Sequence, residues 1–257
     1  MKILYINNFF TEYGGAEQVM KITGDLMRQK GHEIYYFATD KQPYYEENYE
    51  YSKYFPPYSD KRKLDIKDIQ GISFTFYNHI ARKNLLEYLK EVKPDVVNVH
   101  NLHFHLSYSV LDACKEAGVP VAMYIHDPRM FCPGGTLSYG ETYCSEETCI
   151  KGNPIDCILK KCRFGSMRAS VFAAMDAIFA RKLNIHDKVE KFICPSNAIC
   201  GLAARSGLPK GKLVVINHFM SQNELAITPN YDNKGYFLYV GRVDREKGVH
   251  TLIEAMK

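Results

Sequence analysis

Histidines gather where two predicted strands end. His100, His103 and His105 follow one short apolar run, and His126 and Asp127 follow the next. Near neutral pH an imidazole can move a proton, ligate a metal or hydrogen-bond a substrate. One histidine in such a position would most simply be a hydrogen-bonded loop residue. The joint placement of several favours a shared polar site.

Zinc binding is an alternative chemistry for the first group. The spacing of two between His103 and His105 would place both imidazoles on the same face of a strand, where His100 could join them. The segment shows no acidic or cysteine partner for such a site.

Two adjacent glycines, Gly14 and Gly15, stand between a predicted strand and a predicted helix. Paired glycines permit positive φ or a close approach to a ligand, and the first N–H groups of a helix bind anions. The segment could therefore hold a phosphate, or the glycines could only shape a tight turn. The surrounding YGGAE matches neither the GxGxxG dinucleotide pattern nor the P-loop pattern.

Cysteines are concentrated between residues 132 and 162. Cys144 and Cys149 form one C-x4-C pair, and Cys157 and Cys162 form another after a Gly-Asn-Pro turn. This spacing resembles that of structural zinc sites, so these four thiolates are a candidate zinc site. Reduced thiols and disulfides are the alternatives. Four thiolates leave no open coordination position, which argues against a catalytic metal.

Composition describes an ordinary globular protein. The 257 residues are 46% hydrophobic and 24% charged, and the net charge of +4 is too small to indicate nucleic-acid binding. The N-terminus lacks the pattern of a signal peptide, and no apolar run approaches the ~20 residues that span a bilayer. We therefore expect a cytoplasmic protein whose cysteines are reduced or metal-bound.

Apolar runs and helical patterns alternate along the chain. The runs are 2–7, 33–38, 95–99, 120–125, 191–194 and 212–217, and the helical patterns are 16–30, 73–92, 107–117, 163–183 and 198–205. This alternation predicts an α/β fold, a Rossmann-like parallel sheet with helices on both faces. Because ligands bind at the carboxyl ends of such strands, residues 7–15, 100–105 and 126–129 should converge on one rim. Residues 40–68, rich in tyrosine and charge, predict a partly packed surface flap.

Four segments resemble the retaining glycosyltransferases of family 4, which have the GT-B fold. They are YGGAE, the HD of residues 126–127, CPSNAI at 194–199 and YVGRVDREKGVHTLIEAM at 239–256. HDPRMFCPGG with its trailing cysteines resembles a subset of that family. The resemblance implies an acceptor-side Rossmann-like N-terminal domain over 1–220, with a cysteine-rich insertion at about 128–163. A linker would follow over 221–235, and 236–257 would be the first strand and helix of an incomplete donor-binding C-terminal domain.

The resemblance also assigns roles on the donor side. Gly14 and Gly15 match residues near the donor diphosphate, and Arg242 and Lys247 match the basic pair that binds it. Two fixed cations would neutralise the leaving diphosphate, so no cofactor or divalent metal is required for catalysis. Without the resemblance, the charged turn that holds them would be read as solvated surface.

His126 matches the family's catalytic histidine near the transferred sugar. On the same rim, Asn101, His103 and Asp127 are expected to contact the acceptor. The implied activity is retaining transfer of a hexose from a nucleotide sugar to a glycan or lipid-linked acceptor in cell-surface polysaccharide synthesis. Peripheral association with the inner face of the membrane would accompany a lipid-linked acceptor.

The sequence departs from the family in one respect. The E-x7-E motif of the family's second domain is missing, so these residues alone should be inactive or nearly so. The alternative function is a non-catalytic sugar-binding or interaction module of the same fold. A nucleotide-binding oxidoreductase is disfavoured because GxGxxG is missing.

Overall fold

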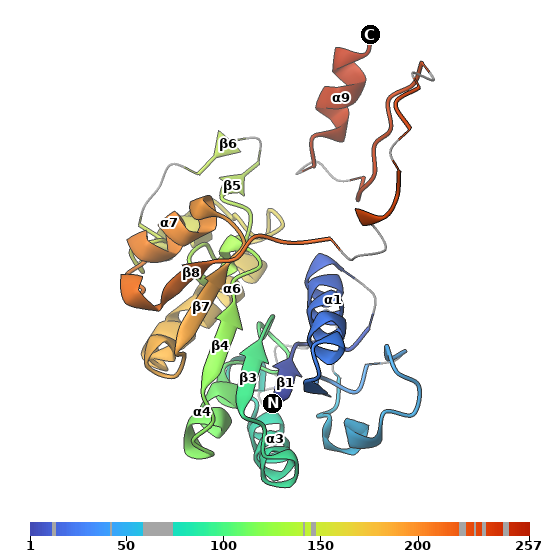
Figure 1. The fold of residues 1–257 in the computed structure, drawn as a ribbon. Coiled ribbons are helices and arrows are strands. Elements are labelled where there is room, and N and C mark those ends of the chain that lie inside the picture. The colour runs from blue at the N-terminus through green and yellow to red at the C-terminus, as the bar shows by residue number, and fades with distance from the viewer. Residues whose placement is uncertain are drawn as a thin grey trace. The chain divides into compact units, whose positions relative to one another are not determined.

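The computed structural model describes residues 1–11, 14–41, 43–58, 74–140, 142–144, 148–220, 225–228, 230–232, 235–243 and 247–257. These residues form two compact units, Met1–His218 and Phe219–Lys257 (Figure 1). The division falls beside the end of the predicted first domain at residue 220.

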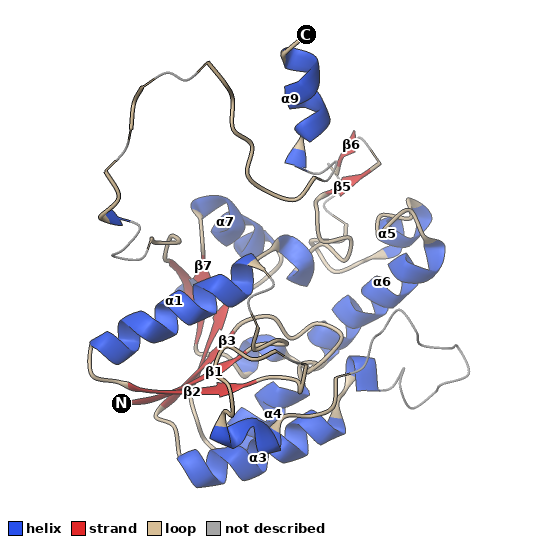
Figure 2. Cartoon of the chain, turned by 90° about the vertical axis from the view of Figure 1, so that its right-hand side faces the viewer, coloured by secondary structure: helices blue, strands red, loops and turns tan. Residues whose placement is uncertain are grey.

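Within the described ranges, the first unit contains a six-stranded parallel sheet in the order β2-β1-β3-β4-β7-β8. The strands are β1 (Lys2–Ile6), β2 (Glu33–Phe37), β3 (Val96–Val99), β4 (Val121–Tyr124), β7 (Lys191–Cys194) and β8 (Leu213–Val215). The helices are α1 (Gly15–Gln29), α3 (His79–Val92), α4 (Ser109–Glu116), α5 (Ile155–Leu159), α6 (Met167–Lys182) and α7 (Asn197–Arg205). Figure 2 shows α1 on one face of the sheet and α3 and α4 on the other. The predicted Rossmann-like fold is confirmed.

Short elements complete the unit. They are the 3₁₀ helices η1 (Glu50–Tyr54), η3 (Pro128–Met130), η4 (Ile185–Asp187) and η5 (Lys210–Lys212), and the hairpin strands β5 (Ser138–Tyr139) and β6 (Thr142–Tyr143). No helix in the described ranges is both long and apolar enough to cross a membrane.

Strand β1 lies at the topological switch point of the sheet. It pairs with β2 on one side and β3 on the other, so the chain changes direction across the sheet at β1. Its residues Leu4, Tyr5 and Ile6 are buried, as an apolar run covered on both faces requires. In open α/β sheets, ligands bind beyond the carboxyl ends of the strands at such a switch point.

Helix α3 is shorter than the predicted helix 73–92, whose first residue lies outside the described ranges. The Asn78 side chain accepts a hydrogen bond from the Ala81 N–H and caps the helix, which begins at His79. The backbone N–H of Asn78 donates to Ser107 Oγ over 2.9 Å. This contact ties the start of α3 to the loop after β3.

The described part of the predicted surface flap, up to residue 58, is partly packed: a few residues enter the core and most stay half-buried or exposed. Tyr49 and Phe55 are buried. The Tyr49 hydroxyl accepts a hydrogen bond from the Tyr36 N–H at 2.7 Å and lies 2.9 Å from the Tyr88 hydroxyl. These bonds satisfy polar groups that burial would otherwise leave unpaired. The rest of the predicted flap, residues 59–68, lies outside the described residues.

The second unit contains helix α9 (Val249–Ala255). Residues 236–240 do not form the predicted strand, because they pair with no strand in the described part of the chain. Phe237 and Leu238 are 77% and 76% exposed. A strand needs a neighbour to satisfy its backbone groups, and sequence periodicity cannot supply one.

Candidate functional site

Two asparagines join the ends of β1 and β3. The Asn101 N–H donates to Asn7 Oδ1 at 3.0 Å, and the Asn8 N–H donates to the Asn101 carbonyl at 2.9 Å. The Asn8 amide then spans the loop, donating to the carbonyl of His103 and accepting from the N–H of Leu106. Asn7 and Asn8 are both buried. The loop after β3 is therefore held by the end of β1.

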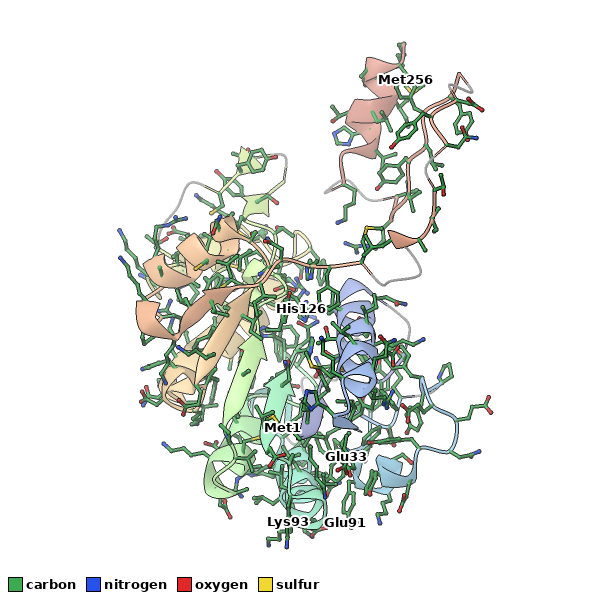
Figure 3. All side chains as sticks on the ribbon, viewed as in Figure 1. Met1, Glu33, Glu91, Lys93, His126 and Met256 are labelled. Atoms are coloured by element: carbon green, nitrogen blue, oxygen red, sulfur yellow. The ribbon has the colours of Figure 1, made fainter. Side chains whose placement is uncertain are left out.

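The predicted His126 meets His100 at this rim. Val99 lies opposite Met123 in the paired strands β3 and β4, so the two histidines follow adjacent strands at the same end. His100 Nδ1 lies 2.6 Å from His126 Nε2. His100 is buried, whereas His126, labelled in Figure 3, is only partly buried. One ring nitrogen of His126 is thus occupied by the protein itself.

Aromatic rings surround this pair. The Tyr124 ring stacks on His126 with centroids 4.5 Å apart, and on His218 with centroids 5.7 Å apart. Burial, together with His218, lowers the pKa of His126 to about 4, against an opposing effect of Asp127. Burial and the neighbouring His126 also hold the pKa of His100 well below its ordinary value. Both imidazoles are therefore neutral at pH 7.

The carboxylate of Glu17 lies beside the glycine turn. Gly14 has an extended backbone with φ of −151°, so the turn does not use positive φ there. A Cβ added to Gly14 would lie 2.8 Å from Glu17 Oε2, whereas one added to Gly15 would meet nothing within 4 Å. Glu17 is buried, and its Oε1 accepts a hydrogen bond from Asn7 at 2.9 Å. A carboxylate in the first turn of α1 already complements the positive end of the helix dipole.

His103 is enclosed rather than presented to a ligand. Its Nδ1 lies 2.7 Å from Asp176 Oδ2, and its Nε2 lies 3.4 Å from the Tyr108 hydroxyl. All three side chains are buried. This contact fixes the loop after β3 to α6.

The other two predicted acceptor residues differ in their placement. Asp127 Oδ1 accepts the Arg129 N–H at 2.8 Å and caps η3, and its side chain is about one-third exposed. Asn101 is partly exposed, with its backbone held by Asn7 and Asn8. Both residues follow strands that end at the rim, and their contact with an acceptor stays a prediction.

The cysteine insertion brings several of its thiols close enough to affect one another's pKa. No group of three or more His, Cys, Asp or Glu residues in the described ranges is arranged to hold a metal ion. Burial raises the pKa of Cys149 to about 11 and of Cys157 to about 12, with neighbouring cysteines adding to the effect. The pKa of Cys162 is raised for the same reasons, and Cys144 is the fourth predicted ligand. Zinc binds thiolates and would itself lower these pKa values on binding, so the zinc site stays a prediction.

Arg242 and Lys247 lie in the second unit. Both are exposed, and the Arg242 carbonyl accepts a hydrogen bond from the Tyr239 hydroxyl at 2.7 Å. Residues 244–246, within the predicted charged turn, fall outside the described ranges. The predicted contact of these two cations with a donor diphosphate stays a prediction.

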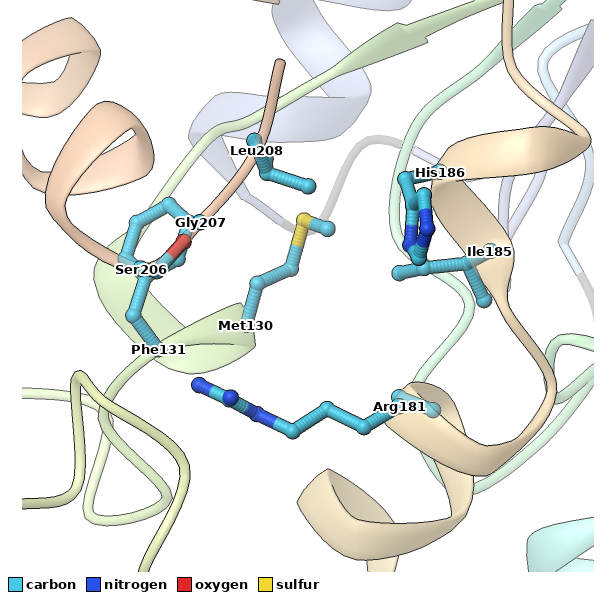
Figure 4. Close-up of a pocket in the computed structure, with 9 residues that line it drawn as sticks. Met130, Phe131, Arg181, Ile185, His186, Ser206, Gly207 and Leu208 are labelled. Atoms are coloured by element: carbon cyan, nitrogen blue, oxygen red, sulfur yellow. The ribbon is translucent and has the colours of Figure 1, made fainter.

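A pocket of about 280 Å³ is lined in part by η3, the short helix that Asp127 caps (Figure 4). Its lining comes from η3, from the end of α6 with η4, and from the end of α7. Arg181 extends along it, and the guanidinium donates to the Ile150 carbonyl at 2.7 Å. None of the residues predicted from the sequence lines this pocket.

The sequence interpretation missed several residues that build the rim. Asn7 and Asn8 lie in the segment 7–15 that the sequence places at the rim, but they have no predicted role of their own. Glu17 lies in the YGGAE motif but was not singled out. Asp176 and His218 carry no local signal, because their partners lie 73 and 94 residues away in the chain.

Comparisons with known proteins complete the description of the site. The family model "Glycosyltransferase Family 4" matches residues 13–221. No curated protein matches the chain.

Solved structures provide three further comparisons. MurG from Acinetobacter baumannii aligns at 12% identity and a TM-score of 0.41, covering 87% of this chain and 47% of that one. UDP-N-acetylglucosamine 2-epimerase from Rickettsia bellii aligns at 12% identity and 0.42, covering 84% and 44%. S. aureus MnaA with UDP aligns at 12% and 0.41, covering 83% and 44%. The chain spans less than half the length of each of these proteins.

Proposed function

The chain belongs to glycosyltransferase family 4, and from this premise we propose that its first unit is the acceptor-side half of a retaining hexosyltransferase. The proposed donor is a nucleotide sugar. The proposed acceptor is a glycan or a lipid-linked glycan in cell-surface polysaccharide synthesis.

One observation carries this proposal. A series of contacts links the start of α1 to the end of β4. Asn7 contacts both Glu17 and Asn101. His100, the residue before Asn101, contacts His126. The glycine turn and the partly exposed histidine are therefore parts of one connected rim at the switch point of the sheet.

The charge state of His126 suits the proposed chemistry. As the nucleotide diphosphate leaves, positive charge develops on the sugar ring, as in other glycosyl transfers. A protonated imidazole beside that ring would oppose the charge. With a pKa of about 4, His126 is neutral at pH 7 and can hydrogen-bond a sugar hydroxyl without electrostatic cost.

The donor diphosphate needs cations beyond the first unit. The Glu17 carboxylate, next to Gly14, weakens anion binding by the α1 N-terminus. We therefore assign charge neutralisation to Arg242 and Lys247 of the second unit, following the family pattern. The 257 residues alone should bind the donor weakly and turn it over little.

The test is transfer from a panel of nucleotide sugars, measured with the full-length natural protein and with these 257 residues. We expect turnover only in the full-length protein, and a loss of about 10²-fold or more in kcat for His126→Ala. A matched control is His250→Ala, an exposed histidine of the second unit. Undiminished turnover by His126→Ala would remove His126 from the site. Glycan binding with no turnover by any form would favour the non-catalytic module.

A further inference from the structure

We propose that His100 is a positioning residue that holds His126 in the tautomer protonated at Nδ1. This inference rests on the proposed function for its catalytic consequence, but its geometry stands without it. His100 would act through His126 and would not touch the substrate.

A single proton lies between the rings of His100 and His126. His100 Nδ1 and His126 Nε2 are 2.6 Å apart, which is a hydrogen bond. A hydrogen bond between two imidazoles contains one proton, so one nitrogen donates and the other accepts. Because a neutral imidazole carries a single N–H, the choice of donor also fixes the state of both outer nitrogens.

The burial of His100 determines which of the two rings donates the hydrogen bond. Its Nε2 is buried and has no hydrogen-bond partner among the described residues. If His126 were the donor, His100 would carry its proton on Nε2 and bury an orphaned N–H. Orphaned buried backbone N–H groups are rarer in proteins than under-satisfied carbonyl oxygens, and we apply the same order to the ring nitrogens of His100. His100 therefore donates from Nδ1 and keeps a bare lone pair on Nε2.

The donor assignment determines the tautomer of His126. Its Nε2 accepts from His100, so its own proton must sit on Nδ1. The titratable groups around it are His100, Tyr124, His218 and Asp127. The low pKa values of His100 and His126 mean that no further proton enters the pair at pH 7. His126 thus offers an Nδ1–H donor, whereas a free histidine side chain favours the Nε2–H tautomer.

NMR spectroscopy measures the tautomer of His126 directly. In a long-range ¹H–¹⁵N correlation spectrum of the ¹⁵N-histidine-labelled 257-residue chain at pH 7, we expect the Nδ1–H pattern for His126. His100→Ala should shift His126 to the Nε2–H pattern. His100→Asn should restore the wild-type pattern, because its amide N–H can stand in for Nδ1–H. His250→Asn is the matched control and should change nothing.

Activity provides the second reading. In the full-length protein, loss of a correctly aligned donor should lower kcat about tenfold in His100→Ala with little change in KM, and His100→Asn should recover most of it. An Nε2–H pattern for His126 in the wild-type chain overturns the inference without any variant. An unchanged pattern in a folded His100→Ala protein does the same. If no form shows transfer, the spectra still decide the tautomer, so failure of the proposed function is distinguishable.

Discussion

At the scale of single residues, the glycine turn has an internal partner. Gly14→Ala would place a methyl group 2.8 Å from Glu17 Oε2, and the buried Glu17 is held by Asn7. We expect the free energy of unfolding to fall by about 1 kcal/mol. Gly15→Ala is the matched control, since nothing lies within 4 Å of its added methyl group and alanine is a better helix former. Urea unfolding that ranks Gly14→Ala as the more stable variant would contradict this reading.

The buried contact of Asp176 with His103 should contribute strongly to stability. Asp176→Ala leaves the buried His103 Nδ1 without its partner, and we expect unfolding to become easier by about 3 kcal/mol. Asp187 pairs with His186 at 3.6 Å in an exposed position. Asp187→Ala should change stability by less than about 0.5 kcal/mol. Equal effects of the two substitutions in chemical denaturation would remove the special status of Asp176.

The depressed pKa of His126 predicts acid sensitivity. In the unfolded chain the imidazole takes up a proton near pH 6.5, but in the folded chain only near pH 4. Its stabilising contribution is therefore complete above about pH 6.5 and is lost progressively as pH falls toward 4, with His100 acting in the same direction. Urea midpoints between pH 7.5 and 4.5 should fall more steeply for the wild type than for His126→Asn. Parallel profiles would show that the ring is not protected from protonation.

At the scale of elements, the cysteine insertion contains the four cysteines of the predicted zinc site. The zinc prediction expects near-stoichiometric zinc in the purified chain and its loss in Cys149→Ser, with thiols moving into coordination as they lose their protons. Cys200→Ser, outside the insertion, should retain the metal. Metal analysis that finds no zinc in the wild type would leave reduced thiols as the answer, in agreement with the raised pKa values of Cys149 and Cys157.

The elements themselves were predictable where their signal was local. The apolar runs became the six strands because alternation and burial act over a few residues. Helix α3 began later than predicted because Asn78 caps it, and the cap depends on a loop 29 residues away in the chain. The 236–240 run failed as a strand because it has no neighbour in the described part of the chain. A strand is a property of a pair, and periodicity describes only one member.

At the scale of the whole molecule, the two units should differ in stability. Every buried hydrophobic residue in the described ranges lies between residues 3 and 203, so the described part of the second unit contributes no core of its own. A chain ending at His218 should keep the melting temperature of the 257-residue chain within about 2 °C, because burial supplies most of the stability. A much lower melting temperature would show that residues 219–257 stabilise the first unit.

The sequence by itself determined the alternation of strands and helices, the parallel Rossmann-like sheet and membership of glycosyltransferase family 4. It also placed His126 at a strand end facing the rim. Only the tertiary structure decided which polar groups pair there: His100 with His126, His103 with Asp176, and Glu17 with Asn7 at the glycine turn. Periodicity is set by neighbours along the chain, whereas these contacts depend on strand order and register, which bring together residues up to 73 positions apart.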